Sequence, residues 1–484
     1  MKTLRPRLLL FLVALAAVFS LSNTGGALPV FPSAVGFGTD TPAGRKGRIV
    51  RVTNLLDDDK KPPAGSFRHA VEKVTGPRVV IFDVSGVIDL KRDIIIRDDG
   101  HGKHGHLTIA GQTAPFPGIT LKGAGIDISS HDILIQHIAI RPGDKLPPVD
   151  NRDCIKIGAP KDHAARNIVI DHVSCSWAVD ETVSTWSDRG RVHDVTFSNC
   201  IFSEPVINGG HSKGSHPYGP LVGRNSNNVT LVGNIMAFTW ARNPLARDKG
   251  AGAQIVNNLV YRPGIWSNCA IYIGDLPQDP RPVSVVGNVV VRHPVPFTIS
   301  RSEEGKPRAA RTHTKEDYRD TAIYVHKGVS PPPELFLRDN RLFNPVDGKW
   351  LPEDGDPWNT GIFRDSPENP VTKLKADPYA NSGGTSWTPL PSTEVEARLL
   401  AAAGKHPAKR DALDAALVEK IRNRQGSFLE DLPMDAWDIV DIRATRVLAP
   451  PPDPNGDPDG NGYTNLEEWL HRRAAEVEGR SHDN

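Results

Sequence analysis

Short apolar runs, each interrupted by one small or polar residue, recur along the chain at spacings that fall mostly between 24 and 35 residues. The runs are LTIAGQT (107–113), ILIQHIAI (133–140), IVIDHVSCS (168–176), VTFSNCIFS (195–203), VTLVGNIMA (229–237), QIVNNLVY (254–261), VSVVGNVVV (283–291) and LFLRDNRLF (335–343). No helical period separates them, and a strand-rich repeat of this length indicates a solenoid. The pattern therefore predicts an all-β fold, a right-handed parallel β-helix.

One small or polar residue takes the same place in each run. These residues are Gly111, His137, His172, Asn199, Asn234, Asn258, Asn288 and Asn340. An Asn at the bend of each coil can bond the Asn of the next coil and satisfy turn groups that would otherwise be buried without partners. We therefore expect one column of side chains inside one bend, with Cys175 and Cys200 as reduced core residues beside it.

Outside the repeat the chain changes character. A basic start (Lys2–Arg7), an apolar run (Leu8–Leu21) and small residues to position 27 have the layout of a secretory signal peptide, too short for a membrane span. We assign residues 28–345 to the β-helix, 346–449 to an irregular and mostly α-helical extension, and 450–484 to a tail. The mature protein is expected to be soluble and secreted, either extracellular or periplasmic.

The insertions between runs carry the candidate chemistry. Loops that leave the same bend of successive coils stack on one face of a solenoid. The residues that this stacking can bring together are Asp153, Asp180, Glu181, Lys213 and Arg242. Arg242 and Arg247 also flank Pro244 in the pattern R-x-P-x-x-R, and a planar, permanently charged guanidinium is suited to carboxylates. The face therefore predicts an acid cluster beside cations that grip an acidic ligand.

The R-x-P-x-x-R segment, followed by a run with Asn257–Asn258, resembles the catalytic segment of pectate lyases. The order GFGTDTPAGRKG, GSFRHAVEK, VVIFDVSGVIDL and LTIAGQTAP over residues 36–115 is similar to the start of extracellular members, with the usual GGRGG loosened to AGRKG. The resemblance implies a Ca²⁺-dependent enzyme that cleaves polygalacturonate by β-elimination. It makes Arg242 the base and Arg247 a substrate-binding residue.

The same resemblance implies metal ligands. Asp153 lies in RDCIKI, similar to a D-x-I-x-I segment with a calcium-binding Asp, and Asp180 is at the first position of a D/E-x-x-x-D pair. Ser184 stands where the second acid of that pair is usual. Either Glu181 replaces the missing ligand, or the site is weaker and is completed by substrate.

Lys213 lies in HSKGSHPYGPLVG, whose end resembles the family's lysine-bearing L-x-G segment. The insertion leaves the register open, so Lys213, His211 and His216 compete for this place. Lys213 is preferred as the catalytic cation because a point charge on a flexible stem suits a uronate carboxylate. The two histidines are then candidates for substrate binding.

The tail contains DPDGNGYTNLEE (457–468), which matches the EF-hand pattern D-x-[DN]-x-[DN]-G-x5-E. The predicted Ca²⁺ ligands are Asp457, Asp459, Asn461, the Tyr463 carbonyl and Glu468. Prolines replace the entering helix, and a following helix is expected to about Glu478. The role of this loop is expected to be structural.

The composition limits which classes of binding partner are expected. Lys plus Arg (58) balances Asp plus Glu (57), which argues against a nucleic-acid partner, and four cysteines are too few for a disulfide scaffold. We expect a monomer, without a membrane span, that acts on an acidic plant or algal polysaccharide. Three alternatives stay open: a pectin-lyase-like enzyme for methylated or other uronate polymers, a β-helix glycoside hydrolase, and a non-catalytic polysaccharide-binding β-helix.

Overall fold

The computed structural model describes residues 28–98, 100, 102–247, 252–264, 271–273, 281–317, 321–325, 332–365, 370–380, 382 and 387–480. The predicted signal peptide and Cys269 lie outside these residues, so their assignments remain predictions. Within the described chain, Cys154, Cys175 and Cys200 are buried and free, as expected for reduced core residues. No helix in that part of the chain combines the length and apolarity needed to cross a membrane.

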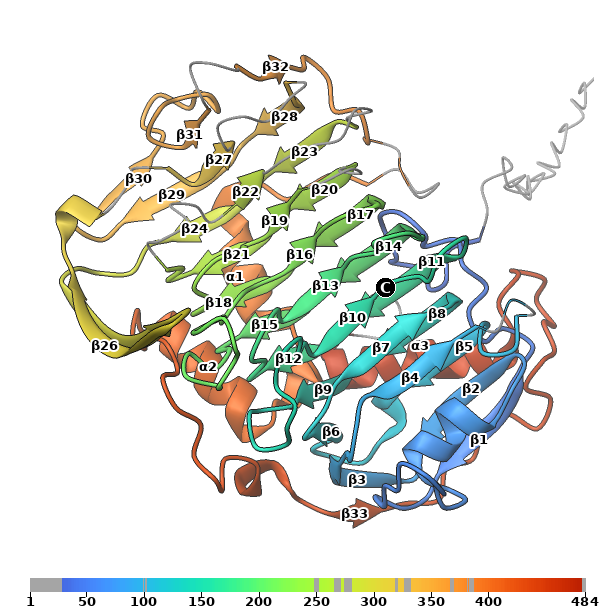
Figure 1. Ribbon diagram of the computed structural model, residues 1–484. Helices are drawn as coiled ribbons and strands as arrows, with labels where there is room; N and C mark the ends of the chain where they lie inside the picture. The colour runs from blue at the N-terminus through green and yellow to red at the C-terminus, as the bar shows by residue number, and fades with distance from the viewer. Residues whose placement is uncertain are drawn as a thin grey trace, which may run out of the picture.

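The chain winds in coils around one core, and each full coil contributes one strand to each of three sheets (Figure 1). Sheet I contains β1 (Arg48–Val52), β2 (Arg78–Phe82), β5 (Leu107–Ala110), β8 (His131–Gln136), β11 (Ala164–Asp171), β14 (Arg191–Ser198), β17 (Ser226–Val232), β20 (Ala253–Val256), β23 (Val283–Val286), β28 (Glu334–Arg338) and β32 (Thr372–Lys373). Sheet II contains β4 (Ile94–Arg97), β7 (Ile126–Ser129), β10 (Ile155–Ile157), β13 (Val183–Thr185), β16 (Leu221–Val222), β19 (Leu245–Ala246), β22 (Ile271–Ile273), β27 (Ile323–Val325) and β31 (Phe363–Arg364). Sheet III contains β3 (Val84–Asp89), β6 (Ile119–Lys122), β9 (Ile138–Arg141), β12 (Ser174–Ser176), β15 (Ile201–Ser203), β18 (Ile235–Ala237), β21 (Leu259–Tyr261), β24 (Val289–Val291), β29 (Arg341–Asn344), β30 (Lys349–Leu351) and β33 (Ala444–Thr445).

The predicted parallel β-helix is confirmed by the pairing between coils, which is parallel along each sheet except where β30 and β33 join their neighbours. This register places similar side chains above one another in successive coils. In sheet I one inward column runs Leu107, Ile133, Ile168, Val195, Val229, Ala253, Val283 and Leu335. All of these side chains are buried in one hydrophobic cluster. The repeat in the sequence is therefore the repeat of the coil.

The structure contains the predicted polar column, but the sequence places His137, His172 and Asn199 in it one residue too early. The Asn234, Asn258, Asn288 and Asn340 side chains form a ladder in which each amide donates to the next side-chain oxygen at 2.9 Å. Strand register continues this column through Cys200, Val173 and Ile138. His137, His172 and Asn199 sit just before it, at left-handed backbone positions with φ of 57°, 51° and 53°. An apolar run alone does not distinguish these two adjacent places.

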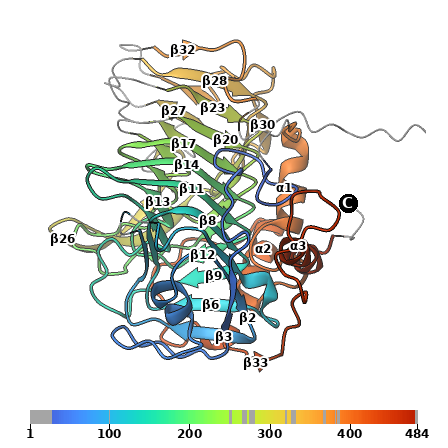
Figure 2. The same ribbon diagram turned by 90° about the vertical axis from the view of Figure 1, so that its right-hand side faces the viewer.

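The C-terminal extension packs on the outside of the coils (Figure 2). Helices α1 (Ser392–Ala402) and α2 (Ala412–Arg422) cover sheet III through one hydrophobic cluster, and α3 (Asn465–Glu478) packs on sheet I through Leu466, Trp469 and Leu470. Ser392, the first residue of α1, donates a hydrogen bond to Asp339, and Asp411 caps α2. Strands β31 and β32 also continue the coils past the predicted end at residue 345.

One hairpin leaves the last coils. It is formed by β25 (Phe297–Glu303) and β26 (Lys306–His313), which pair in antiparallel fashion. A π-helical turn is formed by His69–Lys73. Neither element alters the core, which is made by the three sheets.

The ladder should carry measurable stability. Asn288→Ala removes bonds to Asn258 and Asn340 and leaves buried polar groups without partners. We expect a loss of about 2–3 kcal/mol in the free energy of unfolding, measured by urea denaturation. Asn227→Ala, at a half-exposed position of β17, is the matched control and should change it little. Equal stability of the two variants would contradict this role.

Candidate functional site

A cleft of about 1010 Å³ lies on the outer face of sheet II. Among its lining residues are Asp153, Asp180, Glu181, Lys213, His216, Arg242 and Arg247. These residues come from loops that enter or leave β10, β13, β16 and β19, which are neighbours in Figure 1. The convergence predicted from loop stacking therefore exists in the structure.

Three carboxylates gather at the floor of the cleft. Asp153, Asp180 and Glu181 are buried, and each offers a carboxylate oxygen within 4.8 Å of the others. Burial and the neighbouring charge of Asp180 raise the pKa of Asp153 well above its usual range. Ser184, the residue found where an acid was expected, donates a hydrogen bond to Asp153. Ser184 thus orients one acid of the cluster.

The acid cluster has the chemistry of a site for a hard divalent cation. Within the described part of the chain, Asp153 Oδ1 and Asp180 Oδ1 are buried without a hydrogen-bond partner. Burying like charges together is costly unless a counter-charge is present. Oxygen-only ligands suit Ca²⁺. The residues present therefore fit this ion.

Arg242 lies against the cluster. Its guanidinium contacts the Glu181 carboxylate and lies 4.3 Å from the centre of the Tyr218 ring. Its backbone is left-handed, with φ of 63°, and its carbonyl approaches Gly219 so closely that a Cβ there would lie 2.1 Å from the oxygen. Only glycine fits this approach. The backbone that presents Arg242 is therefore tightly constrained.

The remaining cations and histidines surround the acids unequally. Arg247 follows β19, Lys213 is exposed, and both line the cleft. His216 also lines it, whereas His211 does not. His211 is buried behind His216, with stacked rings 4.4 Å apart, and its Nε2 lies 3.6 Å from Asp180. His211 therefore lies next to the acid cluster, and its role in substrate binding stays a prediction.

Lys156 and Trp186 also line the cleft but were not predicted as site residues from the sequence. Lys156 points from β10 into the cleft, and its ammonium lies 3.0 Å from Asp93. Burial lowers its pKa, but the charges of Asp93 and Asp153 outweigh this and raise it. Alternation along IKI (155–157), with Ile155 and Ile157 inward, could have placed Lys156 outward. Trp186, just past β13, had no comparable signal.

The tail loop holds its predicted ligands close together. The Asn461 amide donates to Asp459 and to Glu468, both at 2.9 Å, and Asp457 accepts a bond from the Gly462 backbone. Helix α3 follows with a capping box of Thr464 and Glu467, and it ends at Glu478 as expected. The loop geometry suits an EF-hand-like Ca²⁺ site, which stays a prediction.

Comparisons with known proteins cover part of the chain. No protein-family model matches it. It is similar to the probable pectate lyase C of Aspergillus flavus, with 32% identity over 282 residues, which are 58% of each chain. The relative of the same description in Neosartorya fischeri is 33% identical over 284 residues, again 58% of each. The chain thus spans less than two thirds of these relatives. The solved cedar pollen allergen jun a 1 is 17% identical, with a TM-score of 0.49, over 77% of this chain and 92% of that one.

The acid cluster makes a prediction about Ca²⁺ binding. In a Glu468→Gln background, which removes the binding expected of the tail loop, Asp153→Asn and Asp180→Asn should each weaken Ca²⁺ binding by at least about tenfold, because each removes one charged ligand. Calorimetric titration measures this. Asp127→Asn, on β7 in the same cleft but outside the cluster, should bind normally. Unchanged affinity in both cluster variants would contradict the site.

The tail loop makes a separate prediction. Glu468→Gln should lower the thermal midpoint measured in saturating Ca²⁺ by about 2–4 °C, because ligand binding to the folded state stabilises it. In chelator the variant and the wild type should melt together, which is the control. A midpoint that is equal with and without Ca²⁺ in the wild type would argue against metal binding here.

Proposed function

We propose that the protein is a secreted, Ca²⁺-dependent pectate lyase that cleaves (1→4)-linked polygalacturonate by β-elimination and yields 4,5-unsaturated oligogalacturonides. One observation carries the proposal: an oxygen-only acid cluster and two arginines line the same cleft. The fungal relatives, described as probable pectate lyases, support it. The R-x-P-x-x-R segment bearing both arginines supports it further.

The reaction needs a base and a stabilised carboxylate. A base takes the C5 proton of a uronate, the C5–H electron pair forms the C4–C5 double bond, and the bond from C4 to the glycosidic oxygen breaks. Arg242 is the proposed base, since it stands at the edge of the acid cluster on a constrained backbone. In the structure its guanidinium contacts Glu181, so it must turn from this carboxylate to reach a C5 proton.

Asp153, Asp180 and Glu181 would hold Ca²⁺. When bound, Ca²⁺ would supply positive charge near the substrate carboxylate, where negative charge develops. Arg247 is proposed to grip a uronate carboxylate with its planar fork. Lys213 is exposed and adds a positive charge to the same cleft, and His216 also lines it.

Substitution of the two arginines should change different kinetic constants. Arg242→Lys should lower kcat at least about 100-fold with little change in KM, because the base is lost. Arg247→Lys should instead raise KM, because the fork that holds a carboxylate is lost. The wild-type rate should climb with pH above neutrality, since a guanidinium accepts a proton only in its neutral form. The assay follows ultraviolet absorbance of the unsaturated product from polygalacturonate.

Arg191→Lys, exposed at the start of β14 and outside the cleft, controls for the substitution itself. If Arg242→Lys keeps the wild-type rate, Arg242 is not the base, and Lys213 or a histidine takes this role in the proposal. Full activity in excess chelator would favour a calcium-free enzyme for methylated substrates. If no uronate polymer gives a product, the remaining alternative is a non-catalytic β-helix that binds polysaccharide.

A further inference from the structure

A second cluster of metal-ligating side chains lies on a different face of the coils from the cleft. His137 follows β8, His172 follows β11, and Glu478 is the last residue of α3. Each offers one ligand atom, and these atoms all lie within 4.8 Å of one another. The end of the chain and two successive coils therefore meet at one point.

The spacing of these atoms fits a tetrahedral metal ion. His137 Nε2 lies 3.3 Å from Glu478 Oε1, and His172 Nε2 lies 3.8 Å from Glu478 Oε2. Bonds of about 2.0–2.1 Å at a tetrahedral angle place ligand atoms roughly 3.3 Å apart. The two imidazole rings stack with centroids 4.9 Å apart and an interplanar angle of 20°. Small shifts would bring all three atoms to one ion.

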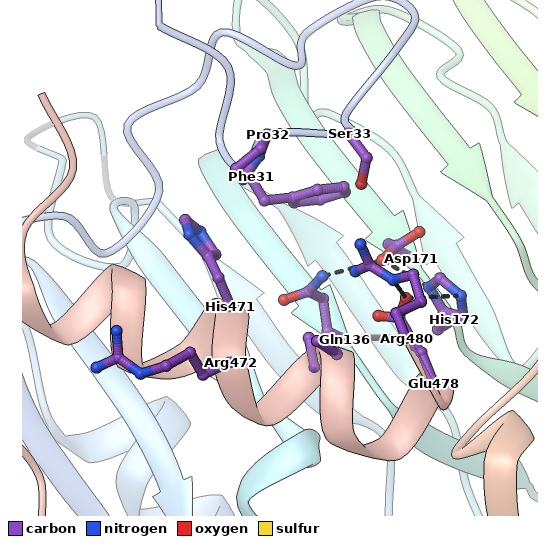
Figure 3. Close-up of a pocket in the computed structure, with 12 residues that line it drawn as sticks. Phe31, Pro32, Ser33, Gln136, Asp171, His172, His471, Arg472, Glu478 and Arg480 are labelled. Atoms are coloured by element: carbon purple, nitrogen blue, oxygen red, sulfur yellow. Dashed lines mark hydrogen bonds and ion pairs between the residues drawn. The ribbon is translucent and has the colours of Figure 1, made fainter. Parts of the chain in front are cut away.

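His172 is already oriented as a ligand. Its Nδ1 lies 2.8 Å from Asp171 Oδ2, and Asp171 is itself held by Gln136 at 2.9 Å and by Ser198 at 2.7 Å. Figure 3 shows Asp171, His172, Glu478 and Arg480 close together at one end of the pocket. A carboxylate on one ring nitrogen fixes the tautomer and leaves the other nitrogen to bind metal.

His137 supplies the second observation. It is completely buried, and among the described residues neither of its ring nitrogens has a hydrogen-bond partner, although Nε2 faces Glu478. Leaving a buried polar group unsatisfied is costly. A cation between His137 Nε2 and Glu478 Oε1 would give this nitrogen a partner.

A pocket of about 200 Å³ adjoins the cluster and leaves room for a water molecule as a further ligand (Figure 3). Its lining includes Gln136, Asp171, His172, Glu478 and Arg480. Arg480 bonds Glu478 Oε2 at 2.7 Å, which leaves Oε1 facing His137. The carboxylate is thus positioned to offer one oxygen to the site.

We propose that His137, His172 and Glu478 form a site for a divalent transition metal ion of the Zn²⁺ class, which ties the C-terminal helix to the coils. Two imidazoles and one carboxylate favour such an ion over Ca²⁺, which prefers oxygen ligands. The site is structural and separate from the cleft. Its test is therefore independent of whether the protein is a lyase.

The test uses the full mature chain, stripped of metal and titrated with Zn²⁺ in excess Ca²⁺ so that oxygen-only sites are occupied. The wild type should bind one Zn²⁺, and its thermal midpoint should rise. Glu478→Gln and His172→Asn should each weaken Zn²⁺ binding at least about 100-fold and abolish the rise. Glu476→Gln, an exposed position on the same helix with the same loss of charge, is the control and should behave as the wild type.

Co²⁺ gives a second readout, because a tetrahedral site intensifies its visible absorption. That absorption should appear in the wild type and in Glu476→Gln but not in Glu478→Gln. Metal-free melting curves report folding of each variant directly. The proposal is overturned if the stripped wild type does not bind Zn²⁺ at one equivalent, or if Glu478→Gln binds it as tightly as the wild type.

Discussion

Backbone pairing in register between successive coils is the constraint on which the rest of the structure depends. In sheet II, Ile155 pairs with Val183, and Ser184 pairs with Leu221, which pairs with Leu245. This register fixes where each loop leaves the coil. A slip of one residue would turn every side chain of a strand to the opposite face and separate the acids from the arginines.

The cleft concentrates charge in a protein that is nearly neutral as a whole, with a formal net charge of +1. Buried carboxylates lie beside half-buried guanidiniums on sheet II. Such an arrangement raises the free energy of the ligand-free protein, since desolvated charges are costly without partners. The bend that carries the polar ladder is different, because neutral amides satisfy each other there. The solenoid thus separates a part that stabilises from a part suited to binding.

The sequence predicted the coil repeat and the convergence of Asp153, Asp180, Glu181 and Arg242, because both follow from local spacing. It misplaced His137 and His172 by one position, since an apolar run does not show which residue of a bend turns inward. It did not predict that Arg141 would be buried against Asp411 and Asp414 of α2, at 2.9 and 2.7 Å. Contacts between segments this far apart depend on tertiary packing, which no local pattern encodes.

The tail closes the opposite end of the molecule from the last coils. Strand β33 pairs with β3, and the Arg446 backbone bonds the Asp83 carbonyl at 2.8 Å. A chain is synthesised from its N-terminus, so this cover arrives long after the first coil has emerged. Until then the β3 edge offers unpaired backbone groups to any neighbouring strand. Protection from self-association is therefore acquired only once β33 has been made, however early the first coils form.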